Sequence, residues 1–179
     1  MAFRYRRSLM ATRAATASNL STGAKVAAAV FWGVGILLGF LVAPVEDQPG
    51  NVWVLRVLTF LIWLGMGVAL ILREKRMAAR GEALDRDTTA FDLWTIPHTW
   101  AGVVFGIWGL TFPLVAGLTI LWEVFEWLVP GFGETESLSN RVVDVAVAWG
   151  AWLLVAGAVA LITQTPMPWL LPSMESIIR

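Results

Sequence analysis

The chain has 179 residues, of which 58% are hydrophobic and 15% are charged, and its formal net charge is zero. Soluble domains are about 45–50% apolar, and their apolar residues are dispersed along the sequence. In this chain the apolar residues form long blocks, which favours membrane spans over a soluble domain. The lack of cysteine excludes disulfides, thiolate metal sites and cysteine nucleophiles, and the single histidine excludes a haem held by two histidines of one copy.

The apolar residues form four blocks along the chain, at about 26–43, 52–72, 97–129 and 142–163. A helix needs roughly 20 apolar residues to cross a bilayer core of about 30 Å, and the first, second and fourth blocks have this length. The blocks lack the alternation of apolar and polar residues that is typical of barrel strands. Backbone N–H and C=O groups in lipid must be hydrogen-bonded within the protein, so the blocks are predicted to be helices. The sequence therefore predicts an all-α polytopic membrane protein: a basic N-terminal tail over 1–25, four transmembrane helices within 26–163, and a C-terminal tail over 164–179.

Positive charges are distributed unevenly between these blocks. Five precede the first block and five lie between the second and the third: Arg4, Arg6, Arg7, Arg13, Lys25, Arg73, Lys75, Arg76, Arg80 and Arg86. The segments 44–51 and 130–140 contain no Lys or Arg and carry acids instead. The positive-inside rule therefore predicts a multi-pass cell-membrane protein with the N-terminus and the 73–96 loop in the cytoplasm and the acidic segments outside. Four spans return the C-terminus to the cytoplasm.

The third block is longer than a bilayer requires. Its 33 residues from 97 to 129 would form about 50 Å of helix. One tilted helix, kinked at Pro113, could absorb this excess, or the chain could break near 111–113 and form a hairpin that inverts everything downstream. The charge distribution favours one continuous helix, in which His98 lies about 37 Å from Glu123. In the hairpin, these two residues would reach similar depth.

Charged residues gather near the ends of the third and fourth blocks. Glu123 and Glu126 are three residues apart and share one helix face. Asp144 lies in the first turn of the fourth block, just after Asn140 and Arg141. In the continuous-helix arrangement all five meet at the outer mouth of the bundle, where ionisable groups often mark a functional site. They could bind Mg²⁺ or Ca²⁺, hold a lipid headgroup or accept a proton. They could also be solvated acids that Arg141 neutralises.

Two further residues complete the candidate site. Arg56 lies one turn into the second block. Its side chain can snorkel outward or pair with the glutamates. We expect pairing, because opposite charges at the same depth in the membrane lower each other's desolvation cost. His98 can cap a helix, pair with Asp92 or face water, and is an alternative ligand. No metal or cofactor is expected. The predicted ligand-binding residues are Glu123, Glu126, Asp144, Arg141, Arg56 and Asn140, with His98 as a further candidate.

Small residues and tryptophans predict how the helices pack. Small residues recur four apart, which lets helix backbones approach closely, in the pairs Gly35/Gly39, Gly102/Gly106 and Ala146/Gly150. Several tryptophans lie deep within the blocks, where we expect them to pack between helices or contact lipid: Trp32, Trp63, Trp108, Trp149 and Trp152.

Part of the later half resembles the VanZ-like small polytopic membrane proteins over about 55 residues. The resembling pieces are His98 opening a helix, Glu123-x-x-Glu126, and Arg141-x-x-Asp144 followed by small residues around Gly150. The chain departs from the family at Glu126, where Gln is usual, and at Ala148, where Asn is usual. The resemblance implies a membrane role near the cell envelope or its lipids.

Three functions follow from these features. The first is binding of a lipid or polar headgroup at an outward-facing acidic site. The alternatives are a non-catalytic structural subunit of a larger membrane complex, and a small proton-coupled carrier. No catalytic residue is assigned, because the sequence lacks a phosphate-binding loop, a G-x-S-x-G elbow and an H-E-x-x-H motif. The expected partners are membrane lipids and also other membrane proteins. Nucleic acid is not an expected partner, because the basic residues flank the predicted spans and are explained by membrane topology.

Overall fold

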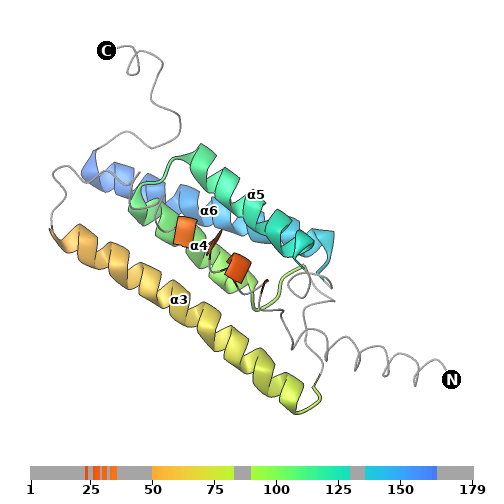
Figure 1. The fold of residues 1–179 in the computed structure, drawn as a ribbon. Helices are drawn as coiled ribbons and strands as arrows, with labels where there is room; N and C mark the ends of the chain where they lie inside the picture. Colours follow the sequence, from red (N-terminus) through yellow and green to blue (C-terminus); the bar gives the residue numbers. More distant parts are fainter. Residues whose placement is uncertain are drawn as a thin grey trace.

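A computed structural model describes residues 23, 26–28, 30–31, 33–35, 50–82, 90–129 and 136–164. These residues are all-α, without strands (Figure 1). The main helices are α3 (Gly50–Ala79), α4 (Thr95–Trp108), α5 (Phe112–Leu128) and α6 (Leu138–Thr163). Apart from residues 23 and 164, the predicted tails over 1–25 and 164–179 lie outside the described residues, as does most of the first block over 26–43.

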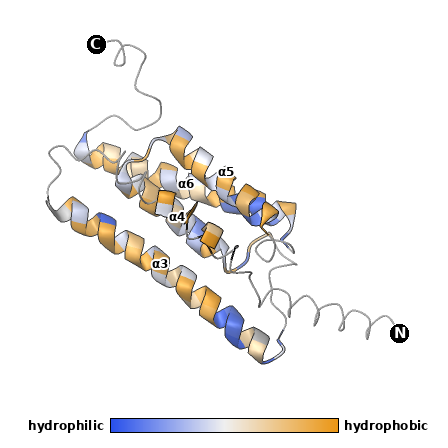
Figure 2. Cartoon of the chain, in the orientation of Figure 1, coloured by the Kyte–Doolittle hydropathy of each residue, from blue (hydrophilic) through white to orange (hydrophobic). Residues whose placement is uncertain are grey.

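Within the part of the chain that the structure describes, two helices are long and apolar enough to cross a membrane. They cover Val52–Met77 within α3 and Leu138–Thr163 in α6, and each has 26 residues. At 1.5 Å per residue each is about 39 Å long, which exceeds a bilayer core. Only 11% of the most apolar stretch of α3, and 22% of that of α6, is buried. Figure 2 shows that hydrophobic residues predominate along both helices. Many of their large apolar side chains are exposed, as expected for contact with lipid rather than for a soluble core.

The prediction of one continuous helix over 97–129 is wrong, and the structure has the alternative hairpin. Helix α4 ends at Trp108 and α5 begins at Phe112. Gly109 adopts a left-handed φ of 72°, and its N–H bonds back to α4, as is common where a helix ends at glycine. Pro113 lies in the first turn of α5, where its missing N–H costs no helical hydrogen bond.

Contacts between the helices fix their directions. A Cβ built on Gly102 would meet Ala148, and one on Gly106 would meet Val155, so α4 and α6 run parallel. Helix α3 runs antiparallel to α4, because Trp94 at the start of α4 donates to Glu74 near the end of α3 (2.6 Å). Helix α5 also runs antiparallel to α4, since α5 turns back after a short connection (Figure 1).

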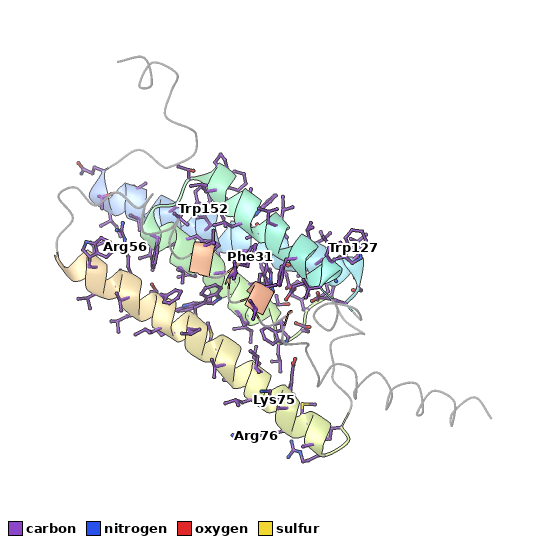
Figure 3. The ribbon with its side chains drawn as sticks, viewed as in Figure 1. Phe31, Arg56, Lys75, Arg76, Trp127 and Trp152 are labelled. Carbon is purple, nitrogen blue, oxygen red and sulfur yellow. The ribbon has the colours of Figure 1, made fainter. Side chains whose placement is uncertain are left out.

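One end of the bundle therefore carries the end of α3, the start of α4, the end of α5 and the start of α6. We call it the basic end, after Arg73, Lys75, Arg76 and Arg80 of α3. Figure 3 shows Lys75, Arg76 and Trp127 toward this end and Arg56 toward the other. Helix α6 thus starts at the basic end, whereas the continuous-helix arrangement put its start at the opposite end.

Tryptophans join the helices through their indole N–H groups. The donors and acceptors, 2.9–3.3 Å apart, are Trp63 to Pro97, Trp100 to Thr59, Trp108 to Arg56, Trp149 to Thr119 and Trp152 to Leu110. All these acceptors are carbonyl oxygens except the Thr119 hydroxyl. Packing between helices is therefore confirmed for the deep tryptophans except Trp32, which lies outside the described residues. In an apolar surrounding, these bonds satisfy polar groups and fix the relative positions of the helices.

The small-residue prediction is confirmed for one pair and wrong for another. Gly102 and Gly106 lie tightly against α6. Ala146 and Gly150 instead lie on the exposed face of α6, and a Cβ on Gly150 would have no described heavy atom within 4 Å. The face of α6 that packs inward carries Asp144, Ala148, Trp152, Ala156 and Ala160. Gly35 is also open, and Gly39 lies outside the described residues.

Candidate functional site

His98 of α4 lies between carboxylates from two other helices at the basic end. Its Nδ1 is 3.7 Å from Oε1 of Glu123 on α5, and its Nε2 is 3.7 Å from Oδ2 of Asp144 on α6. The α4–α5 turn makes this possible, because it brings the end of α5 back beside the start of α4. The hairpin thus joins His98 to residues that a continuous helix would have kept far away.

Glu126 completes what we call the acid–histidine cluster: His98, Glu123, Glu126 and Asp144. It lies one turn beyond Glu123 on the same face of α5, as the spacing predicts. One ligand atom from each of His98, Glu123 and Glu126 lies within 4.8 Å of the other two. Three helices therefore contribute side chains to one small volume.

The two acids that face His98 are withdrawn from solvent. Glu123 is 8% exposed and Asp144 is fully buried. Neither carboxylate has a hydrogen-bond partner of standard geometry among the described residues, although Thr95 is close enough to Asp144 to interact with it. Burying carboxylates without hydrogen bonds costs free energy, so stability alone does not account for this arrangement.

Arg141 is a cation that lies beside the cluster. Its Nη1 donates to the main-chain oxygen of Glu123 (2.9 Å) and lies 4.0 Å from the Glu123 carboxylate. Its Nη2 lies 3.7 Å from Glu136. Arg141 therefore ties the end of α5 to the start of α6. It balances part of the negative charge, because four acids (Glu123, Glu126, Glu136 and Asp144) lie nearby.

Polar residues around the start of α4 and α6 hold these helices in place. The Asp92 carboxylate accepts the main-chain N–H of Trp94 (2.7 Å) and of Thr95 (3.2 Å), and so caps the start of α4. Ser137 caps α6. The buried Asn140 donates from Nδ2 to the carbonyl of Ala90 (3.2 Å). Asn140, which we predicted as a ligand-binding residue, thus fastens α6 to the segment before α4.

The predicted pairing of Arg56 with the glutamates is wrong. Arg56 is 2% exposed and lies at the far end of the bundle from the cluster (Figure 3). Its Nη2 and Nε point at the carbonyls of Trp108 (3.3 Å) and Ile107 (3.5 Å). These carbonyls end α4 and carry the negative end of its dipole, which attracts a cation. Arg56 also lies over the ring of Trp53, 5.0 Å from its centroid.

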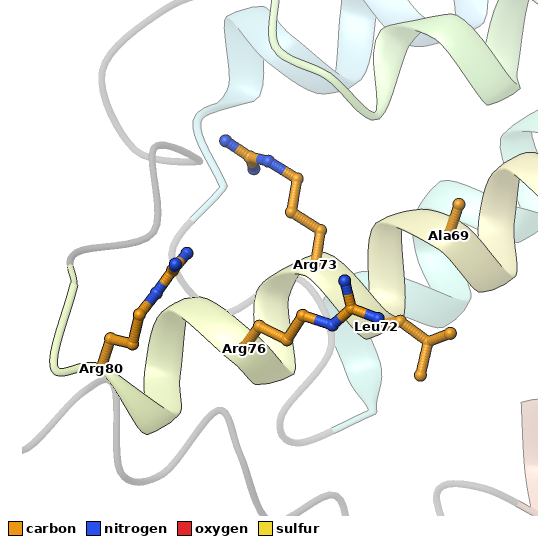
Figure 4. A pocket seen from close by; sticks show the side chains of 5 residues that line it. All are labelled: Ala69, Leu72, Arg73, Arg76 and Arg80. Atoms are coloured by element: carbon orange, nitrogen blue, oxygen red, sulfur yellow. The ribbon is translucent and has the colours of Figure 1, made fainter.

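A pocket that we did not predict lies at the basic end of α3. It is lined by Ala69, Leu72, Arg73, Arg76 and Arg80 (Figure 4). The sequence carried the signal, since the three arginines recur at helical spacing and so share one face. Arg80 also pairs with Glu82 at 2.9 Å. The pocket and the acid–histidine cluster belong to the same end of the bundle but have opposite charge.

Comparison of the chain with protein-family models, curated proteins and solved structures found no match. The resemblance to VanZ-like proteins therefore stays a prediction from the motifs.

Proposed function

We propose that this chain is a multi-pass cell-membrane protein that binds the polar headgroup of a membrane lipid or lipid-linked molecule at the basic end. The observation that carries this proposal is the pair of buried carboxylates, Glu123 and Asp144, which lie on either side of His98 and make no hydrogen bond of standard geometry with the residues that the structure describes. Ionisable groups among apolar helices are costly and usually serve a function. The VanZ-like resemblance, which implies a role near envelope lipids, agrees with this proposal.

The positive-inside rule supports a cytoplasmic basic end, and therefore a cytoplasmic site. This revises the outward-facing site that the continuous helix required. The 14 residues of α4 and the 17 residues of α5 give about 21 and 26 Å, less than a bilayer core, which suits a hairpin that enters and leaves on one side. We therefore propose three crossings (the first block, α3 and α6) and this hairpin, with the end of α6 outside.

Both charge types at the basic end suit a headgroup. Arg73 and Arg76 of the pocket can approach lipid phosphate, and each basic residue near anionic lipid contributes about 1 kcal/mol. The acid–histidine cluster suits a positively charged group. A headgroup at the membrane surface can reach both, because it carries polar atoms just outside the apolar core.

The proton-coupled carrier has less support. Such a carrier needs polar groups along a path through the bilayer. Thr119 is one of the few polar side chains in α5, and its hydroxyl bonds to the carbonyl of Val115 (2.9 Å) and accepts the indole N–H of Trp149. Its hydrogen-bonding capacity is therefore used in holding the helices together.

The proposal is tested by the lipid that the protein retains. The full chain and its Glu123→Gln and Asp144→Asn variants are purified in mild detergent, and bound phospholipid is quantified by mass spectrometry. We expect roughly tenfold less lipid on both variants, which corresponds to about 1.4 kcal/mol of binding free energy. The control is Glu82→Gln, which removes an exposed acid outside the cluster.

Equal lipid retention in all four proteins would contradict headgroup binding at this site. If a larger complex co-purified equally with all four, the result would favour the structural-subunit alternative. Size-exclusion chromatography of each variant shows whether the fold is kept, so that a loss of lipid is not confused with unfolding.

A further inference from the structure

We propose that His98, Glu123 and Glu126 bind a divalent transition-metal ion such as Zn²⁺, with Asp144 orienting the histidine. This inference goes beyond headgroup binding, because it rests on the ligand geometry and does not require a lipid. One imidazole nitrogen and two carboxylates are protein ligands for zinc, and such sites leave a fourth position open.

The distances suit such an ion. Two ligand atoms that are each about 2.0–2.1 Å from a tetrahedral Zn²⁺ lie about 3.3 Å from each other. Nδ1 of His98 and Oε1 of Glu123 are 3.7 Å apart, so a shift of a few tenths of an ångström would bring both to bonding distance. Glu126 lies one helical turn further along and belongs to the same group of ligand atoms within 4.8 Å.

The other ring nitrogen of His98 supports the same assignment. Metal-bound histidines almost always direct their second ring nitrogen at a carboxylate or carbonyl, which fixes the ring and raises its basicity. Nε2 of His98 faces Asp144, whose carboxylate is fully buried on α6. Asp144 is therefore the positioning residue of this site, and Nδ1 is the nitrogen that faces the other acids.

The charge balance points to a cation as well. The carboxylates of Glu123 and Asp144 are buried without hydrogen bonds in the described part of the chain, and both are directed at His98. Arg141 reaches the carboxylate of Glu123 only at 4.0 Å and also contacts Glu136. A dication beside Glu123 would neutralise charge of this carboxylate that Arg141 leaves uncompensated.

The nitrogen ligand that His98 supplies determines which metal ions the site prefers. Mg²⁺ and Ca²⁺, which the acids alone suggested, prefer oxygen ligands throughout. A site with one imidazole nitrogen suits Zn²⁺ or Fe²⁺ better. We therefore expect Zn²⁺ to bind more tightly than Mg²⁺ or Ca²⁺.

The test uses the purified full chain in detergent after treatment with a chelator. Titration with ZnCl₂, followed by calorimetry, is expected to show one ion per chain. His98→Ala and Glu126→Gln should each weaken binding by at least about tenfold, and Asp144→Asn by roughly 10–100-fold. Glu82→Gln should bind as the wild type does. Glu126 is less buried than Glu123, so its variant is the safer test of binding without loss of fold.

Electron paramagnetic resonance with Cu²⁺ in place of Zn²⁺ identifies the nitrogen ligand. Nitrogen coupling in the wild type that disappears in His98→Ala would support the site. Zinc binding of equal strength in the wild type, His98→Ala and Glu126→Gln would overturn it. Zinc binding without retained lipid would refute only the headgroup proposal, whereas lipid retention without any zinc binding would refute only the metal site.

Discussion

Arg56 shows how a single buried charge can serve the fold rather than a site. Its guanidinium lies against the last carbonyls of α4 and over the ring of Trp53. The indole of Trp108 donates back to the main-chain oxygen of Arg56 (3.3 Å). Helix α3 and the end of α4 are thus joined in both directions, at the turn that leads into α5.

Replacing Arg56 with methionine should destabilise the protein without affecting the site. Hydrogen bonds from a charged donor contribute about 1.5–3 kcal/mol each, so we expect Arg56→Met to lower the free energy of unfolding by about 2 kcal/mol. Arg76→Met, an exposed control on the same helix, should change it by less than about 0.5 kcal/mol. Unfolding in detergent micelles, followed by circular dichroism, measures both. Loss of zinc affinity in folded Arg56→Met would contradict the assigned role.

The sequence marked Arg56 as a residue that needs a partner, but could not identify that partner. Arg56 does lie near the start of its helix, which begins at Gly50. The glutamates seemed to share that depth only because α5 was assumed to continue α4. When α5 turns back, Glu123 moves to the other end of the bundle and the α4 carbonyls become the nearest acceptors.

At the scale of helices, the contact of α4 with α6 positions His98 beside Asp144. A Cβ on Gly102 would collide with the carbonyl oxygen of Ala148 and lie 3.0 Å from the Cβ of Ala151. A Cβ on Gly106 would lie 2.9 Å from that of Val155. Because Ala148 blocks the position with backbone rather than with a flexible side chain, α4 and α6 would have to separate.

We therefore expect Gly102→Ala to destabilise the protein by about 1–3 kcal/mol, the usual cost of overpacking. It should also weaken zinc binding, since separating the helices moves His98 away from Asp144. Gly150→Ala is the matched control on the exposed face of α6 and should be neutral or slightly stabilising, because alanine favours helix. Thermal unfolding and zinc titration of both variants test this. Equal stability of the two variants would refute the close contact.

Small-residue spacing alone could predict the Gly102/Gly106 contact but not which face of α6 receives it. The buried face of α6 runs through Asp144, Ala148 and Trp152 and includes a large side chain, whereas Ala146 and Gly150 match the motif and point outward. Spacing identifies surfaces that permit close approach. Which of them is used depends on the neighbouring helix, and the sequence of α6 does not contain that information.

For the whole molecule, the all-α prediction is confirmed for the described residues, and the second and fourth predicted spans are helices long and apolar enough to cross a membrane. The third predicted span was wrong, because the chain reverses direction between α4 and α5. Gly109 and Pro113 were both signals of a break, but the lack of Lys and Arg in 130–140 was taken to place that segment outside. The positive-inside rule counts basic residues, and acids contribute little to it. A short segment without basic residues therefore says little about its side. The acid–histidine cluster depends on this one turn, because a continuous helix would keep His98 far from Glu123.

Cysteine accessibility tests the hairpin most directly, because the chain has no cysteine of its own. Arg80→Cys, Ser139→Cys and Thr163→Cys are placed singly at exposed positions and labelled with a membrane-impermeant thiol reagent from either side of sealed vesicles. The hairpin predicts that Arg80→Cys and Ser139→Cys react from one side and Thr163→Cys from the other. If Arg80→Cys and Thr163→Cys instead reacted from one side and Ser139→Cys from the opposite side, α4 and α5 would form one crossing and the cluster would not exist.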